Sequence, residues 1–224
     1  MHGPFLQKID CTGKLGIQPL VRMVICFKML SYGNAPDELD ESYQISEMVA
    51  NESLKCFCRL VVELFGDEYL RKNPSEDKKR DILELNSRRG FPGMFGSWDC
   101  KHFKWNSCPT RLAGQHLGKD GKTLVLEAVV DPYLFIWRLF FGEPGSLNDI
   151  NILNRSTILR DILSQNFNTK VDPYTINKRN RDWMYFLVDG IYPKLAIFGS
   201  AINIPTNEKE EIYQKMSNAH LEYW

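Results

Sequence analysis

Two apolar segments that each run into an aspartate constrain this chain of 224 residues more than any other feature. Residues 184–188 are wholly apolar and lead directly into Asp189. Residues 93–100 form a glycine-punctuated strand pattern that places Asp99 at its end. Short, unbroken apolar runs are typical of buried strands. We therefore expect two strands of one sheet whose carboxylates could lie side by side.

Further strands and helices are predicted around these two segments. Residues 123–130 and 134–141 are apolar, β-branched and aromatic, and Asp131-Pro132-Tyr133 joins them as a hairpin turn. Residues 149–163 and 208–223 carry helical spacing. The inward positions expected for the first of these helices are Ile150, Leu153, Ile158 and Ile162. Three strands, a helix, a fourth strand and a helix predict an α/β fold, a mixed sheet flanked by helices that resembles ribonuclease H.

The first 70 residues predict an all-helical region. Leu20, Val24, Phe27 and Leu30 alternate steps of three and four, which places them on one helix face. A second helical unit begins near Ser46, and a third helix opens at residues 51–53. This order is typical of a helix-turn-helix-like module, and a plain helical cap on the next domain is an equal alternative.

Composition separates the helical region from the sheet. Residues 71–89 are charged and interrupted by proline, so we expect a charged linker or the exposed start of a helix there, with the sheet domain over 90–224. The chain lacks a long apolar run and a signal-peptide pattern, which favours an intracellular protein without a membrane segment. A net charge of zero counts against autonomous DNA binding.

The cysteines offer a second, sharper interpretation. Most of the six lie in apolar or strand-like segments, where reduced cysteine behaves as a small hydrophobic residue. We expect free thiols. Cys100, His102 and Cys108 could instead bind a metal, but the paired spacing and the fourth ligand that are typical of zinc sites are missing.

The strand-end acids suggest phosphodiester chemistry. Two divalent ions about 4 Å apart activate a water or a 3′ hydroxyl and stabilise the leaving oxygen, and carboxylates from separate elements hold them. Asp99 and Asp189 would supply two such ligands. Taken alone, either aspartate is equally typical of a turn or a cap.

Four sequence blocks extend this interpretation to a family. They resemble, in the same order, blocks of the PIF/Harbinger-type DDE transposases. The blocks are residues 89–109, with Gly96-Ser97-Trp98-Asp99-Cys100-Lys101-His102 inside them; residues 126–129 and 135–137; residues 140–153; and residues 186–193, with Val188-Asp189-Gly190-Ile191-Tyr192-Pro193. Together with similarities in the helical region, the resemblance spans most of residues 15–210.

The resemblance implies a ribonuclease-H-like nuclease that uses Mg²⁺ or Mn²⁺ to cut DNA at transposon ends. Asp99 and Asp189 correspond to the first two acids of the DDE triad and are the implied catalytic residues and metal ligands. Asp149 matches a further acidic position, with a helix N-cap as its alternative role. The family also implies a Myb/SANT-like partner protein for DNA binding, and a nuclear location, or a cytoplasmic one without that partner.

Two departures from the family pattern bear on activity. The block that carries the third acid is absent, and its expected position falls just beyond Trp224. We therefore expect a C-terminally truncated domain in which Glu222 could substitute for the lost glutamate. Arg138 stands where the family usually has histidine. The alternatives are an impaired nuclease and an inactive, domesticated or degenerate remnant that serves as a DNA-targeting or protein-interaction module.

Overall fold

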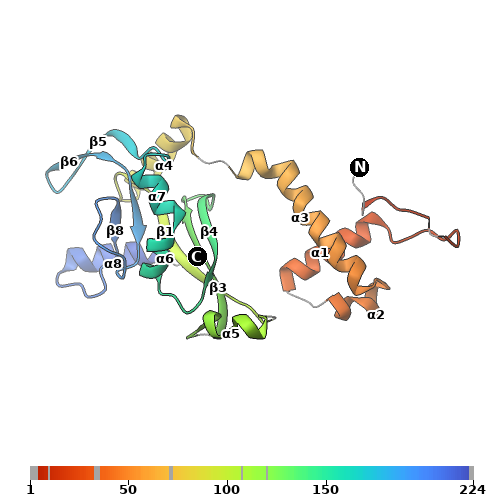
Figure 1. Ribbon diagram of the computed structural model, residues 1–224. Helices are drawn as coiled ribbons and strands as arrows, with labels where there is room; N and C mark the ends of the chain where they lie inside the picture. The colour runs from red at the N-terminus through yellow and green to blue at the C-terminus, as the bar shows by residue number, and fades with distance from the viewer. Residues whose placement is uncertain are drawn as a thin grey trace. The chain divides into compact units, whose positions relative to one another are not determined.

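The structure is a computed structural model that describes residues 5–9, 11–32, 36–70, 73–106, 108–119 and 121–221. The chain divides into two compact units, Met1–Leu70 and Arg71–Trp224, which we call the N-terminal unit and the C-terminal unit (Figure 1). Each unit has its own buried core and is described by itself. No helix in the described ranges combines the length and apolar character needed to cross a bilayer.

Helices make up the N-terminal unit. They are α1 (Pro19–Tyr32), a 3-10 turn η2 (Pro36–Leu39), α2 (Asp40–Tyr43) and α3 (Glu47–Tyr69). Ile25 of α1 packs with Leu39, Ile45 and Ala50 in a small core. Arg22 donates from Nη1 to the buried Ser53 hydroxyl over 3.3 Å, which links α1 to α3. A short helix between two longer ones is therefore present.

Two details of this unit differ from expectation. Residues 46–53 do not form a separate helix, because Ser46 is the N-cap of the continuous helix α3. The predicted stripe from Leu20 to Leu30 is solvent-exposed, and the neighbouring Val21, Ile25 and Met29 face the core instead. Helix α1 is apolar around much of its circumference, so the spacing alone does not show which stripe packs.

The C-terminal unit contains one mixed sheet. Its elements are α4 (Glu76–Arg88), β1 (Met94–Lys104), α5 (Thr110–His116), β2 (Leu117–Gly118), β3 (Gly121–Val130), β4 (Ile136–Pro144), α6 (Asp149–Arg155), α7 (Thr157–Leu163), β5 (Lys170–Ile176), β6 (Arg179–Trp183), β7 (Tyr185–Val188), β8 (Phe198–Ser200) and α8 (Glu208–Leu221). The strands lie in the order β2-β3-β1-β7-β8, with β4 paired to β3. Strand β1 is antiparallel to β3 and parallel to β7.

Helices cover both faces of this sheet. Ile82 of α4, Leu153 of α6 and Ile158 of α7 pack in the main core with Trp98 and Phe186. On the opposite face, α8 contacts β1 and β7 over a second cluster that includes Phe91, Met94 and Leu187. A strand covered on both faces must be apolar at successive positions, as residues 184–188 are. The predicted α/β class, a mixed sheet flanked by helices and compatible with a ribonuclease-H-like fold, is confirmed.

The expected linker is mostly helix α4. Ser75 caps it by accepting a hydrogen bond from the Lys78 amide over 3.3 Å. Ile82, within the helix, is fully buried. The buried Asn86 side chain donates to the Met94 carbonyl over 2.9 Å and so joins α4 to β1. Of the two interpretations of residues 71–89, the exposed helix start agrees with α4 from Glu76 onward and the linker does not, because the charged residues are the exposed face of an amphipathic helix.

Other elements also differ from prediction. The helix expected over 149–163 is two helices, because Ser156 ends α6 and caps α7 by accepting from the Ile158 amide over 3.0 Å. Ile152 takes the buried position expected for Ile150, which is exposed. The sequence interpretation also missed α5, the hairpin β5–β6 and the short strand β8.

We predict that Gly96→Ala destabilises the C-terminal unit more than Gly114→Ala does. A Cβ on Gly96 would lie 2.1 Å from the Val130 carbonyl oxygen, a backbone atom that moves only if β3 moves. A Cβ on Gly114, in α5, would have no neighbouring atom within 4 Å. Chemical denaturation should show a loss of about 2–3 kcal/mol for Gly96→Ala and little change for Gly114→Ala. Equal stabilities would contradict the close approach of β1 and β3.

Candidate functional site

Parallel pairing of β1 and β7 brings two of the predicted acids together. Ser97 pairs with Leu187, and Asp99 and Asp189 each lie two residues further along. Asp189 follows the last residue of β7, is exposed, and accepts a hydrogen bond at Oδ1 from the Gly190 amide. Asp99 lies where β1 begins to leave the core and is half-buried. The two carboxylates are therefore neighbours across adjacent strands.

Asp149 joins them from a third element. It is the first residue of α6, and Asn148 is the N-cap, since its side chain accepts from the Asn151 amide over 2.9 Å. The alternative role of Asp149 as the cap is therefore wrong. Burial, chiefly, raises the pKa of Asp99 and the pKa of Asp149; the charge of Asp149 adds to the rise at Asp99, and the charge of Asp189 adds to the rise at Asp149. Three acids from β1, β7 and α6 thus share one electrostatic environment.

This environment makes Asp99 a weak acid. Burial, chiefly, raises the pKa of Asp99 from 3.8 to about 6, and the charges of Asp149 and Asp189 add to the rise. The Cys100 amide and the Lys101 ammonium act in the opposite direction. A carboxylate whose ionised form is disfavoured gains from any cation placed beside it.

A thiol and a phenol line the interior side of these acids; the sequence interpretation considered Cys100 only as a zinc ligand and gave Tyr192 no role. Cys100 Sγ lies 3.4 Å from the hydroxyl of the buried Tyr192. Burial raises the pKa of both groups above their ordinary values, so both stay protonated near neutral pH. Cys100 and Tyr192 both lie in sequence blocks that resemble the transposase family, and this was the signal that could have drawn attention to them.

His102 and Glu127 complete the surroundings of Asp149. The charge of His102 lowers the pKa of Asp149, and His102 Nδ1 lies 3.0 Å from the Thr123 hydroxyl. Glu127 is fully buried, and its Oε1 accepts from Trp98 Nε1 over 2.8 Å. Burial raises the pKa of Glu127, which favours its protonated form. Glu127 is therefore part of the core and is no solvent-facing ligand.

The zinc alternative is wrong. In the described ranges, no group of three or more His, Cys, Asp or Glu side chains is arranged to hold a metal ion. Cys108 is buried and its thiol faces the Pro109 carbonyl, and all six cysteines are free. The same finding means that the three acids, as placed, do not form a three-ligand cluster.

Two further positions from the family pattern have different outcomes. Glu222, the possible third acid, lies outside the described residues. Arg138 lies with its guanidinium 4.9 Å from the centre of the Phe167 ring, and its Nη2 donates to Asn73 Oδ1 over 3.4 Å. Burial lowers the pKa of Arg138, and the charge of Asp161 raises it.

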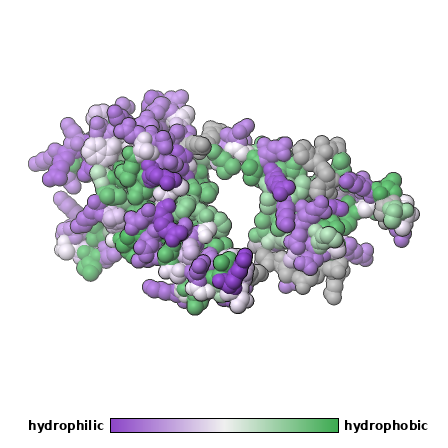
Figure 2. All heavy atoms as spheres, in the orientation of Figure 1, coloured by the Kyte–Doolittle hydropathy of each residue, from purple (hydrophilic) through white to green (hydrophobic). Residues whose placement is uncertain are grey.

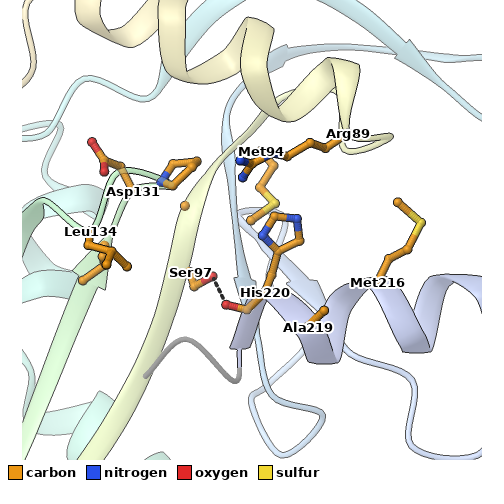
Figure 3. Close-up of a pocket in the computed structure, with 11 residues that line it drawn as sticks. Arg89, Met94, Ser97, Asp131, Leu134, Met216, Ala219 and His220 are labelled. Carbon is orange, nitrogen blue, oxygen red and sulfur yellow. Dashed lines mark hydrogen bonds between the residues drawn. The ribbon is translucent and has the colours of Figure 1, made fainter.

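A cavity of about 610 Å³ lies on the α8 side of β1 (Figure 3). Its walls come from α8, from β1 and from the turn between β3 and β4. The Ser97 hydroxyl donates to the His220 carbonyl over 3.5 Å, and Arg89 lies beside them. Asp131 accepts from the Tyr133 and Phe135 amides and from the Trp137 indole. None of the three candidate acids lines this cavity, so the candidate chemistry lies outside it.

A family model described as plant transposon protein matches residues 67–222. The chain belongs to the plant transposon protein family. The match covers more than half of the chain and includes β1, β7, α6 and the three candidate acids. Searches of curated proteins and of solved structures returned no match. The match therefore shows that the chain is transposon-related.

We predict that Asp99→Asn stabilises the protein at neutral pH and not at pH 4. The folded pKa of Asp99 is raised, so its favourable contribution is complete below pH 3.8 and is lost as pH rises through about 6. Allowing for solvent screening, Asn should gain about 1–2 kcal/mol over Asp at pH 7. Denaturation of both proteins in EDTA between pH 4 and pH 7 measures the difference. A difference that stays constant over this range would show that the pKa of Asp99 is not raised.

Proposed function

We propose that the C-terminal unit is a nuclease of the PIF/Harbinger DDE type that cleaves phosphodiester bonds in DNA at transposon ends. One observation supports this most: acids from β1, β7 and α6 interact at one end of the sheet in a member of a transposon family. Carboxylates from separate elements are what metal-dependent phosphodiester cleavage requires.

The donor set fits a hard divalent ion, Mg²⁺ or Mn²⁺. Asp99 and Asp189 would be its ligands, with Asp149 as a further carboxylate. Magnesium prefers oxygen ligands, retains several waters and is often bound through one or two carboxylates, so a site without three converged protein ligands is still compatible with it. Burial, chiefly, and the charges of Asp149 and Asp189 raise the pKa of Asp99, so its ionised form gains from a cation placed beside it.

Each residue has a separate task in this proposal. Bound metal would polarise the phosphoryl oxygen and activate the attacking water or hydroxyl. The Gly190 amide fixes the Asp189 carboxylate through Oδ1 and leaves Oδ2 for a ligand. Asp99 gives up its proton when the cation is present, and the protonated Cys100 and Tyr192 behind it offer no competing thiolate or phenolate. Glu222 would be the third acid of the triad.

A second candidate function is an inactive remnant that targets DNA or binds a partner protein. The lack of a three-ligand cluster in the described ranges favours it over full activity. In this case the helices of the N-terminal unit would carry the contacts, with a Myb/SANT-like protein as the partner. For both functions we expect a nuclear protein, or a cytoplasmic one without that partner. Metal-dependent cleavage separates the two candidates.

We predict that the chain nicks supercoiled plasmid in Mn²⁺ and that Asp99→Ala or Asp189→Ala lowers the rate at least about 100-fold, because each change removes a metal ligand. Asp81→Ala, which removes an exposed carboxylate from α4, is the matched control and should cleave at the parent rate. Cleavage that survives Asp99→Ala would refute the site. A parent protein that folds but is inactive would favour the second candidate.

Metal binding gives an independent measurement. We predict that Mn²⁺ raises the Tm of the parent, because an ion that binds only the folded state stabilises it in proportion to the logarithm of its concentration above Kd. The Asp99→Ala/Asp189→Ala double variant should lose this rise, whereas Asp81→Ala keeps it. An equal rise in all three proteins would place the metal elsewhere.

A further inference from the structure

The hairpin β5–β6 forms a two-stranded sheet of its own and does not pair with the main sheet. It projects at the edge of the C-terminal unit (Figure 1). Asn177 and Lys178 turn the chain between its strands with φ of 49° and 64°, as in the tight two-residue turns whose twist matches that of paired strands. The result is a narrow ribbon with a defined tip.

The base of this ribbon is anchored on both strands. Trp183 Nε1 donates to the Ala196 carbonyl over 3.2 Å, and Lys79 of α4 donates to the Lys170 carbonyl over 3.4 Å. The Tyr174 hydroxyl donates to the Trp183 carbonyl over 2.8 Å and ties one strand to the other. The hairpin is therefore an ordered arm of the unit.

Positive charge gathers at the free end of the arm. Lys178, Arg179 and Arg181 lie within four consecutive residues, and residues 173–181 contain no acid. In the described part of the chain, none of the three forms a salt bridge. Lys178 and Arg179 are exposed, and Figure 2 shows the arm as hydrophilic spheres at the left edge of the molecule.

The total charge of zero hides an uneven distribution. Residues 71–224 contain 22 Lys and Arg against 18 Asp and Glu, whereas residues 1–70 contain 6 against 10. The expectation that a neutral chain lacks a basic surface therefore does not hold for the C-terminal unit alone. The arm, residues 170–183, carries four Lys and Arg against two acids, Asp172 and Asp182, and its distal part, residues 173–181, carries no acid.

The register sets the direction of the two arginines. Tyr174 pairs with Arg181 and Ile176 with Arg179, so all four side chains share one face of the ribbon. The Arg181 guanidinium lies 5.6 Å from the centre of the Trp183 ring, which supports its orientation. Guanidinium groups suit bidentate recognition of phosphate, and a two-stranded ribbon fits the major groove of a DNA duplex.

We infer that the β5–β6 hairpin is a DNA-binding arm in which Lys178, Arg179 and Arg181 contact backbone phosphates. Strand β7 connects Trp183 directly to Asp189, so duplex held by the arm is fixed relative to the candidate acids. The choice of DNA as the polyanion rests on the proposed function. The charge, exposure and register of the arm do not.

The test is binding of the full chain to a fluorescein-labelled 30-base-pair duplex, measured by anisotropy over a range of KCl concentrations. The variant is Lys178→Gln/Arg179→Gln/Arg181→Gln. The matched control, Lys122→Gln/Lys209→Gln/Lys215→Gln, removes the same charge from exposed positions elsewhere in the unit. A second variant, Lys178→Gln/Arg179→Gln, keeps the Arg181–Trp183 contact in case the triple variant does not fold.

The expected result is an affinity loss of roughly 10- to 100-fold for the triple variant, with a salt slope lower by about 2 to 3, because each lost phosphate contact removes about one unit of slope. The control should stay within about threefold of the parent. Equal losses in variant and control, an unchanged affinity, or a parent that does not bind the duplex would overturn the inference.

Plasmid nicking separates this inference from the proposed function. Asp99→Asn should bind the duplex as the parent does and lose only cleavage. Binding that depends on the arm in a parent that never cleaves would refute the nuclease and leave the arm intact. Cleavage and binding that are both indifferent to the triple variant would refute the arm and leave the nuclease intact.

Discussion

The position of β1 in the middle of the sheet is the constraint on which the rest of the C-terminal unit depends. Its first residues are buried on both faces, between α8 and the layer of α4, α6 and α7, and its last residues are exposed. Asp99 lies at the transition. Parallel pairing with β7 then fixes where Asp189 must lie, and the antiparallel pairing with β3 fixes the other edge. Moving β1 by one residue would exchange the two faces and place the carboxylate of Asp99 on the wrong side.

The same transition explains why the site costs stability. A half-buried carboxylate beside two others lowers the stability of the folded state, and the same arrangement favours binding of a cation. The surrounding structure tolerates it because the layer beneath is rigid: Trp98 packs edge-to-face on Phe186 and Phe198, and its indole donates to Glu127. Such buried aromatic contacts contribute on the order of 1 kcal/mol each beyond area burial.

Sequence predicted those parts of the fold in which pattern and environment agree. Residues 184–188 and Asp189 followed from an apolar run that ends in an acid. Asp99 does not end its strand as predicted, because β1 continues to Lys104. Helix α4 could not be told from a linker because charged residues dominate its composition, although Ile82 is fully buried. The break at Ser156 and the hairpin β5–β6 depend on a cap and a two-residue turn, and these are weak signals between polar residues. The electrostatic interaction among the acids depends on the register in which β1 pairs with β7, and the spacing of residues along the chain does not predict that register.

Helix α4 has a practical consequence for the choice of fragments. A cut at Gly90, where the composition changes, would remove Ile82 and the Asn86 bond to Met94 from an otherwise intact sheet. The exposed core would then be an apolar surface that promotes aggregation, and the fragment would express poorly for reasons unrelated to its activity. A cut near residue 71 keeps helix α4 in place. The beginning of the functional module is thus set by one buried isoleucine and one amide, upstream of every residue that the chemistry would use.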